Sequence, residues 1–313
     1  MCFLLTQLKA ENEYQWLNEV DSNSLQQTLR DLNRAYVNFF KKLANYPKFK
    51  SKKDHEQKYR TQMISENIKV LGNRIQLPKL GGVKAKLSRE VIGSIKNATI
   101  TRTATGKYFV TLGVEQVIET KPNQGNEVGI DVGLKHFYSD SNGNVVDNPR
   151  LWKRFATKLA REQRRLSRKK LGSGQREKQR IKVARVHEKI VNIREDYQHK
   201  LSVRLAKENQ FIAVEKLNIE GMKKNRRLAK AISDVAWGKF FQKLEYKSQE
   251  HGGKLVKVPT FYPSSQTCSC CGYKNPLVKN LAVRDWECPE CHSRHDRDLN
   301  ASINILNKAK ELV

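Results

Sequence analysis

The sequence predicts a mixed α/β protein that combines a helical segment, an antiparallel β-barrel or sheet and a zinc-binding ribbon. Three observations lead to this fold class. Some apolar runs of strand character end in acidic residues. Residues 61–117 form short runs in which apolar and polar residues alternate, and Gly and Asn separate these runs. Two Cys-x-x-Cys pairs follow near the C-terminus. The chain has 313 residues, of which 38% are hydrophobic, so about two or three domains with cores are expected.

The charge of the chain indicates a polyanionic partner. Lys and Arg number 60 against 32 Asp and Glu, a formal net charge of +28, which internal pairing cannot neutralise. No apolar run approaches the length of a membrane-spanning helix, and the N-terminal residues show no signal-cleavage pattern. We therefore expect a soluble, intracellular protein with no membrane partner.

The elements follow in a definite order. Residues 1–60 are predicted to form a helical segment, with helix from about Leu4 to Phe49, because apolar side chains recur there at three- and four-residue intervals and Asp21 or Ser22 can cap a helix. The basic loop that begins at Tyr46-Pro47 is predicted to end the helices. Residues 61–124 are predicted to form the antiparallel strands, with a hairpin turn at Thr105-Gly106 and a linker at its end. Residues 125–313 begin with a strand and continue into a basic helical pair, where positions 150–230 hold 26 Lys and Arg against 8 acids.

The first acidic motif lies in the stretch Val128–Tyr138, where an apolar run delivers the lone carboxylate of Asp131. Gly129 and Gly133 remove side-chain bulk on either side of this acid. An Asp beside a Gly is also a common hairpin-turn signal. This stretch alone therefore allows either a turn residue or a metal-binding carboxylate.

Two further acids end or begin predicted elements. Glu215 ends the apolar run of residues 211–215, where a charge is unusual, although pairing with a nearby arginine would also explain it. Asp296 and Asp298 lie at the start of a predicted helix, whose N-terminus favours carboxylates as caps. Capping suits Asp296 better, because Asp298 falls on the same face as the apolar residues that follow.

The most specific local signal is a pair of Cys-x-x-Cys motifs separated by 16 residues. Their spacing predicts one tetrahedral four-thiolate zinc site in a ribbon at residues 265–294. Four thiolates leave no open position, so this zinc is expected to be structural. The ligands are Cys268, Cys271, Cys288 and Cys291, while Cys270 is expected to be a free thiol and His292 and His295 to be polar surface residues.

The order of these motifs resembles the transposon-encoded TnpB (OrfB) family. The resemblance rests on Gly129–Lys135, Val214–Asn218 with Gly221-Met222, and the cysteine ribbon that runs into His295–Ala301. It covers most of the chain, including the N-terminal helix and the Tyr46–Lys50 loop. Members of this family are RNA-guided DNA endonucleases related to type V CRISPR effectors.

The resemblance implies a RuvC-like nuclease domain of RNase H-like fold with an inserted zinc ribbon, preceded by a helical recognition segment and a wedge-type barrel. Asp131, Glu215 and Asp298 match the catalytic acids of the family. Family members usually begin with a β-strand and further helices before the part that corresponds to Leu4, so the N-terminus is expected to be truncated.

The expected chemistry is hydrolysis of target-DNA phosphodiesters. Asp131, Glu215 and Asp298 would share two Mg²⁺ or Mn²⁺ ions roughly 3.5–4 Å apart, because hard carboxylate oxygens suit these ions and disfavour zinc. A guide RNA would select the target DNA by base pairing. The alternative is a truncated or non-cleaving nucleic-acid-binding protein, either a remnant or a guided repressor, although the intact acids argue against a repressor. A strand-joining transposase is disfavoured, since no Tyr or His-x-His constellation stands out.

Overall fold

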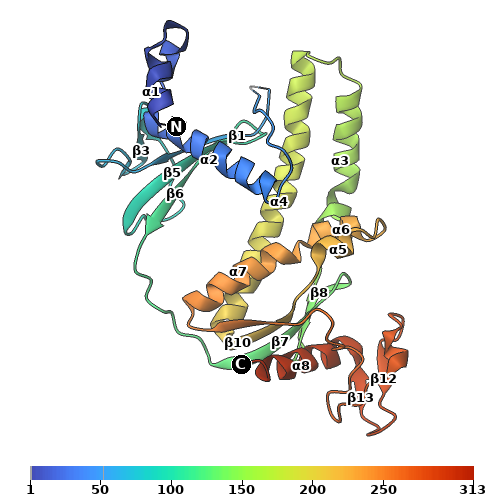
Figure 1. Ribbon diagram of the computed structural model, residues 1–313. Coiled ribbons are helices and arrows are strands. Elements are labelled where there is room, and N and C mark those ends of the chain that lie inside the picture. Colours follow the sequence, from blue (N-terminus) through green and yellow to red (C-terminus); the bar gives the residue numbers. More distant parts are fainter. Residues whose placement is uncertain (1, 52) are drawn as a thin grey trace. The chain divides into compact units, whose positions relative to one another are not determined.

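A computed structural model describes residues 2–51 and 53–313. The chain divides into two compact units, and each has a core of its own. Figure 1 labels the helices and strands along the chain. The first unit comprises the residues up to 117 together with 180–184, and the second comprises 118–179 and 185–313. None of the described helices is both long enough and apolar enough to cross a membrane.

Helices begin the first unit, as the periodicity predicted. The helical region is divided into α1 (Cys2–Ala10), the 3₁₀ helix η1 (Asn12–Asn18) and α2 (Ser22–Phe40). Asp21 is the N-cap of α2, since its carboxylate accepts a hydrogen bond from the Ser24 backbone N–H at 3.0 Å. The same carboxylate accepts a bond of 2.7 Å from the Thr61 hydroxyl, which ties α2 to the first strand.

Two antiparallel three-stranded sheets complete the first unit, in the orders β1-β5-β6 and β2-β3-β4. They share a core built around Ile68, Ile75, Leu77 and Ala98. The predicted antiparallel strands are confirmed, but the described strands pair as two separate sheets, so a closed barrel is not confirmed. The strands are β1 (Gln57–Gln62), β2 (Lys69–Leu71), β3 (Arg74–Leu77), β4 (Gly81–Lys84), β5 (Ser94–Arg102) and β6 (Tyr108–Glu115).

A five-stranded mixed sheet of order β11-β10-β7-β8-β9 organises the second unit. β10 runs parallel to both of its neighbours, β7 and β11, whereas β7, β8 and β9 form an antiparallel meander. The two apolar runs that end in Asp131 and Glu215 are strands of this sheet, as the sequence predicted. Their bounds are β7 (Asn126–Val132), β8 (His136–Asp140), β9 (Val145–Asp147), β10 (Asn209–Glu215) and β11 (Lys254–Val258).

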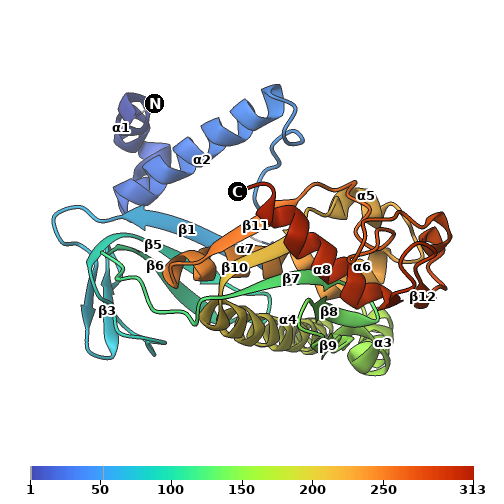
Figure 2. The same ribbon diagram turned by 90° about the horizontal axis from the view of Figure 1, so that it is seen from below.

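Helices cover both faces of this sheet (Figures 1 and 2). Side chains alternate between the faces along a strand, so Ala213 and Val258 meet α8 (Arg297–Lys310) on one face. Val128, Ile130 and Val214 point to the other face, where the core includes residues of α4, α6 and α7. These three helices span Gly174–Glu208, Ala229–Val235 and Trp237–Glu250, and the short α5 (Ile219–Lys223) precedes α6.

The basic helical pair predicted for residues 150–208 consists of α3 (Leu151–Ser167) and α4. Within it, the buried side chain of Gln179 donates to the Glu162 carboxylate at 2.8 Å and to the Glu162 carbonyl at 3.1 Å. This buried contact joins α4 to α3, while most of the basic side chains of the two helices are exposed.

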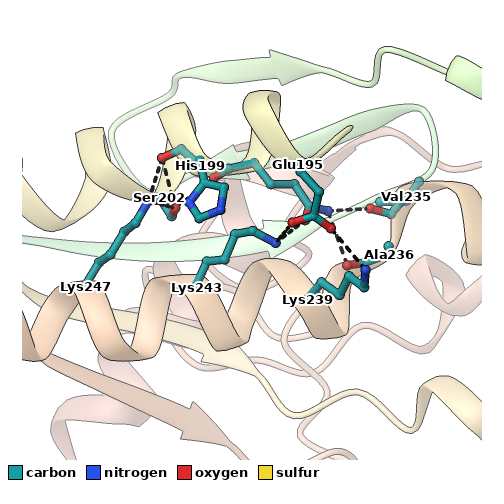
Figure 3. A network of polar contacts seen from close by, with 9 residues as sticks. Glu195, His199, Ser202, Val235, Ala236, Lys239, Lys243 and Lys247 are labelled. Carbon is teal, nitrogen blue, oxygen red and sulfur yellow. Dashed lines mark hydrogen bonds and ion pairs between the residues drawn. The ribbon is translucent and has the colours of Figure 1, made fainter. Parts of the chain in front are cut away.

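Buried lysines connect α4 to α7, as Figure 3 shows. Lys243 Nζ lies 2.7 Å from the Glu195 carboxylate. Lys247 Nζ donates to the Ser202 hydroxyl at 2.9 Å and to the His199 carbonyl at 2.8 Å. Burial lowers the pKa of Lys247, because removal from water disfavours the ammonium form. The α4–α7 interface therefore contains a polar network within its apolar core.

Candidate functional site

The first two predicted acids lie side by side at the ends of two parallel strands. Ile130 of β7 pairs with Val214 of β10, so Asp131 and Glu215 occupy the next position of each strand. Neighbouring strands are about 4.8 Å apart, and residues in register point to the same face. That face is the one covered by α8, since Asp131 has the same parity as Gly129 and Glu215 the same parity as Ala213. Both acids are half-buried.

Gly129 allows α8 to approach this strand closely. A Cβ atom at position 129 would lie 2.0 Å from the Ser302 carbonyl oxygen and 2.9 Å from Leu306 Cβ. No side chain fits there, which explains the glycine two residues before Asp131. Asp298 lies one helical turn before Ser302, in the first turn of α8, so this packing carries the third acid toward the other two.

The electrostatics of the carboxylates reflect this convergence. Burial raises the pKa of Asp131 to about 8, and the negative charges of Asp298 and Glu215 contribute to the rise. Burial also raises the pKa of Glu215 to about 7. The folded chain therefore holds protons at neutral pH on groups that are ionised in water. A bound cation would replace these protons and remove the repulsion.

Arg284, which belongs to the ribbon, forms an ion pair with the Asp298 carboxylate. Arg284 Nη1 lies 3.2 Å from Asp298 Oδ1, and the Arg284 carbonyl accepts a 2.7 Å hydrogen bond from the Arg297 N–H. The charges of Arg297 and Arg284 both act to lower the pKa of Asp131. Nothing in the sequence pattern singled out these two arginines, because neither belongs to a periodic or spaced motif.

The donor set fits a hard divalent cation, with one condition. Asp131, Glu215 and Asp298 offer carboxylate oxygens, the ligands that Mg²⁺ and Mn²⁺ prefer. In the described part of the chain, however, only Cys and His side chains form clusters of three or more possible ligands with all donor atoms within 4.8 Å. The three carboxylates are more widely spaced, and Asp298 must leave Arg284 to join the other two around a metal.

The four predicted cysteines form the tighter cluster. Cys268 Sγ and Cys291 Sγ lie 3.6 Å apart, Cys271 Sγ and Cys288 Sγ lie 3.5 Å apart, and all four sulfurs lie within 4.8 Å of one another. Zinc bonds of about 2.3 Å at tetrahedral angles require sulfur separations of about 3.8 Å. The cluster therefore fits one zinc ion. It lies in a ribbon that contains η2 (Pro276–Lys279), β12 (Asp285–Glu287) and β13 (Arg294–Asp296).

The surroundings of the cysteines correct one expectation. His295, expected on the surface, is buried against Trp286 with ring centroids 4.7 Å apart, and its Nε2 lies 3.0 Å from Cys268 Sγ. A histidine here can stabilise a thiolate by hydrogen bonding. His292 is exposed, as expected, and Cys270 is exposed as well. The Cys270 thiol also lies within 4.8 Å of the Cys268 and His295 donor atoms, so its expected exclusion from the metal site stays a prediction. The Ser293 hydroxyl and backbone N–H lower the pKa of Cys291 to about 6, which favours the thiolate that binds metal.

The ribbon connects directly to the carboxylate site. β13 ends at Asp296, which is also the N-cap of α8 and accepts a hydrogen bond from the Leu299 N–H at 2.8 Å. This confirms the capping interpretation of Asp296. Asp298 follows two residues later, so no loop separates the cysteine ribbon from the third acid.

The fold and the site define a mixed α/β protein that joins a candidate carboxylate site to a four-cysteine ribbon. Comparison with protein families matches residues 109–226 to OrfB_IS605, described as "Probable transposase", and residues 237–305 to the Cas12f1-like TNB domain. The two matches contain the strand ends that carry Asp131 and Glu215 and the first part of α8, which carries Asp298.

Two curated relatives are similar over nearly the whole chain. The "Putative RNA-guided DNA endonuclease" of Streptomyces pristinaespiralis is 39% identical over 96% of this chain and 75% of its own length. The "Putative RNA-guided DNA endonuclease InsQ" of Escherichia coli K12 is 33% identical over 98% of this chain and 79% of its own length. The chain belongs to the TnpB (OrfB) family.

A solved structure shares the fold. It is the protein chain of "Cryo-EM structure of the Cas12f1-sgRNA-target DNA complex", with a TM-score of 0.59 and 14% identity, and the match covers 91% of this chain and 70% of that chain. At this identity the likeness concerns the fold alone.

Proposed function

We propose that this chain is a transposon-encoded, RNA-guided and metal-dependent DNA endonuclease that hydrolyses phosphodiesters of a target DNA. The observation that carries the proposal is the pair of adjacent carboxylates, Asp131 and Glu215, at the ends of parallel strands, with Asp298 delivered by α8. Relatives at 39% and 33% identity bear the name of RNA-guided DNA endonucleases.

The strand order supports an RNase H-like, RuvC-type assignment for residues 125–313. Three antiparallel strands, β7, β8 and β9, are followed by β10 and β11 on the other side of β7, with helices inserted between them. We assign residues 1–60 to a helical recognition segment, 61–124 to a wedge-type barrel, and 265–294 to a structural zinc ribbon. The net charge of +28 suits both a guide RNA and the target DNA.

In this proposal Asp131, Glu215 and Asp298 hold two Mg²⁺ or Mn²⁺ ions. When bound, such ions supply Lewis acidity that activates water and stabilises the leaving oxygen. The chain itself contributes the positions of the acids, at the ends of β7 and β10 and in the first turn of α8. Arg284 keeps Asp298 neutralised in the absence of metal and is free to face a phosphate once Asp298 turns to the ions.

The proposal is tested by cleavage of a target plasmid with protein that is co-expressed with its flanking RNA. Asp131→Asn and Glu215→Gln should each abolish guide-dependent, Mg²⁺-dependent cutting and leave RNA binding intact. Asp196→Asn is a matched control, since Asp196 pairs with Lys200 on an exposed surface. If wild-type protein folds and binds RNA and yet never cuts, the chain is a nucleic-acid-binding protein without nuclease activity.

A further inference from the structure

A second group of metal-ligating atoms adjoins the four-cysteine cluster. Cys268 Sγ, Cys270 Sγ and a ring nitrogen of His295 all lie within 4.8 Å of one another, the same limit that holds for the four cysteines. The two groups share Cys268 and no other residue. Cys270 and His295 therefore stand outside the four-sulfur set and form, together with Cys268, a three-donor group of their own.

One zinc ion cannot use both groups, because a tetrahedral site closes with four ligands. A zinc on Cys268, Cys270 and His295 would leave the other three cysteines without a metal, so the four-cysteine site fills first. Four thiolates carry more negative charge than one Zn²⁺ neutralises. The excess negative charge attracts a second cation, and Cys270 and His295 offer ligand atoms beside it.

Two of the three donors are held in place by the fold. Cys268 is almost fully buried, and His295 is paired with Trp286 between β13 and β12, with ring centroids 4.7 Å apart. His295 Nε2 lies 3.0 Å from Cys268 Sγ, whereas Zn–N and Zn–S bonds at tetrahedral angles place the two ligand atoms about 3.5 Å apart. A separation of about half an ångström would therefore admit the ion.

The third donor is exposed and unused. The Cys270 thiol makes no hydrogen bond with any residue that the structure describes. Within the same described residues, the contact with Cys268 is the one hydrogen bond of the His295 ring. Because Cys270 faces solvent, a water molecule can complete the coordination as the fourth ligand.

The ligand chemistry selects the class of cation. Two thiolates and an imidazole suit Zn²⁺ and the softer Cd²⁺, whereas Mg²⁺ and Mn²⁺ prefer carboxylate oxygens. No carboxylate belongs to this group. The group therefore differs in metal preference from the site of Asp131, Glu215 and Asp298.

We propose that Cys270 and His295 bind a second zinc ion, which shares the Cys268 thiolate with the zinc of the four-cysteine cluster. This second site rests on the four-cysteine zinc site and is independent of the nuclease assignment. It has three protein donors, of which one is shared, so it binds more weakly than the first and fills only when zinc exceeds one equivalent. Its occupation would link the first Cys-x-x-Cys turn to β13, three residues before Asp298.

The test uses the full chain loaded with one equivalent of zinc. Calorimetric titration with further zinc should show a second equivalent bound per chain. After replacement of both ions by ¹¹³Cd²⁺, NMR should give one four-thiolate resonance and one resonance of mixed sulfur and nitrogen ligation. Mutual coupling through the shared sulfur should split both signals.

Each other result of this experiment has a definite meaning. A four-thiolate resonance alone, with no second equivalent of zinc, overturns the second site and leaves the first intact. Absence of the four-thiolate resonance shows that the four-cysteine site itself fails, and the shared thiolate fails with it. Two resonances without mutual coupling overturn the sharing of Cys268.

Variants identify the ligands. Cys270→Ser, at an exposed position, should keep the four-thiolate resonance and lose the second signal. It should weaken binding of the second zinc by more than about a hundredfold, since changes outside the ligands already cost about 10–100-fold. His295→Gln should have the same effect, and His292→Gln is its matched control because His292 is exposed and outside the group. A second equivalent that persists in Cys270→Ser overturns the proposal, as does loss of both ions in that variant.

Discussion

Replacing Gly129 by alanine tests the docking of α8 on β7. The added Cβ would lie 2.0 Å from the Ser302 carbonyl oxygen, and contacts below 3.0 Å are essentially never observed for Cβ atoms. The helix must therefore move by about 1 Å. Since the obstructing atom belongs to the backbone, trimming a side chain cannot relieve the clash.

Overpacking of this kind costs about 1–3 kcal/mol of unfolding free energy. The displacement also moves the first turn of α8, so Asp298 loses its position relative to Asp131. We expect Gly129→Ala to lower the midpoint of urea unfolding and to weaken Mg²⁺ binding, measured by calorimetry, by about tenfold, which corresponds to about 1.4 kcal/mol.

Gly174→Ala serves as the control for this substitution. Gly174 begins α4 with no atom within 4 Å of its Cβ position, so alanine there should leave stability unchanged or raise it by up to about 1 kcal/mol. If Gly129→Ala unfolds within about 0.5 kcal/mol of the wild type and binds Mg²⁺ equally well, the described packing of α8 against β7 is wrong.

Three further predictions follow from the site and the core. Purified protein should contain one zinc per chain by elemental analysis; Cys288→Ser should lose it and Cys270→Ser should retain it, and loss in both would instead implicate a different ligand set. Without divalent cations, the unfolding free energy should fall as pH rises from about 4 to 8, because folded Asp131, with its pKa of about 8, keeps a proton that the unfolded chain releases. Asp131→Asn should flatten this dependence in urea titrations, and an unchanged slope would contradict it. Glu195→Gln should cost about 1–2 kcal/mol by leaving a buried lysine without its anion, whereas Asp196→Asn at an exposed pair should cost under about 0.5 kcal/mol.

Part of the second unit was predictable, because apolar runs indicated strands and the acidic residues and cysteines stood out from those runs. Asp131 and Glu215 were visible as charges at the ends of apolar runs, and the cysteine spacing identified the ribbon. Their adjacency was not visible, since it depends on the register between β7 and β10, strands separated by more than 75 residues of sequence. Local patterns carry no information about which strands pair.

The features that sequence reasoning missed depend on partners distant in the chain. β1, with the sequence Gln-Lys-Tyr-Arg-Thr-Gln, lacks apolar alternation and is a strand because it pairs with β5. The burial of Lys243 and Lys247 on α7 was not predicted, because it depends on acceptors on α4, more than 40 residues earlier in the chain. His295 is buried for the same reason, because Trp286 and Cys268 surround it.

If the proposed zinc and Mg²⁺ sites are both occupied, the direct junction of β13 and α8 links them thermodynamically. In that case, zinc that orders the ribbon also fixes Asp296 as a cap and thereby the orientation of Asp298. By reciprocity, any gain in Mg²⁺ affinity that zinc confers must appear as an equal gain in zinc affinity when Mg²⁺ is bound. Zinc availability would then set the concentration of Mg²⁺ at which the carboxylate site fills, although zinc takes no part in the chemistry.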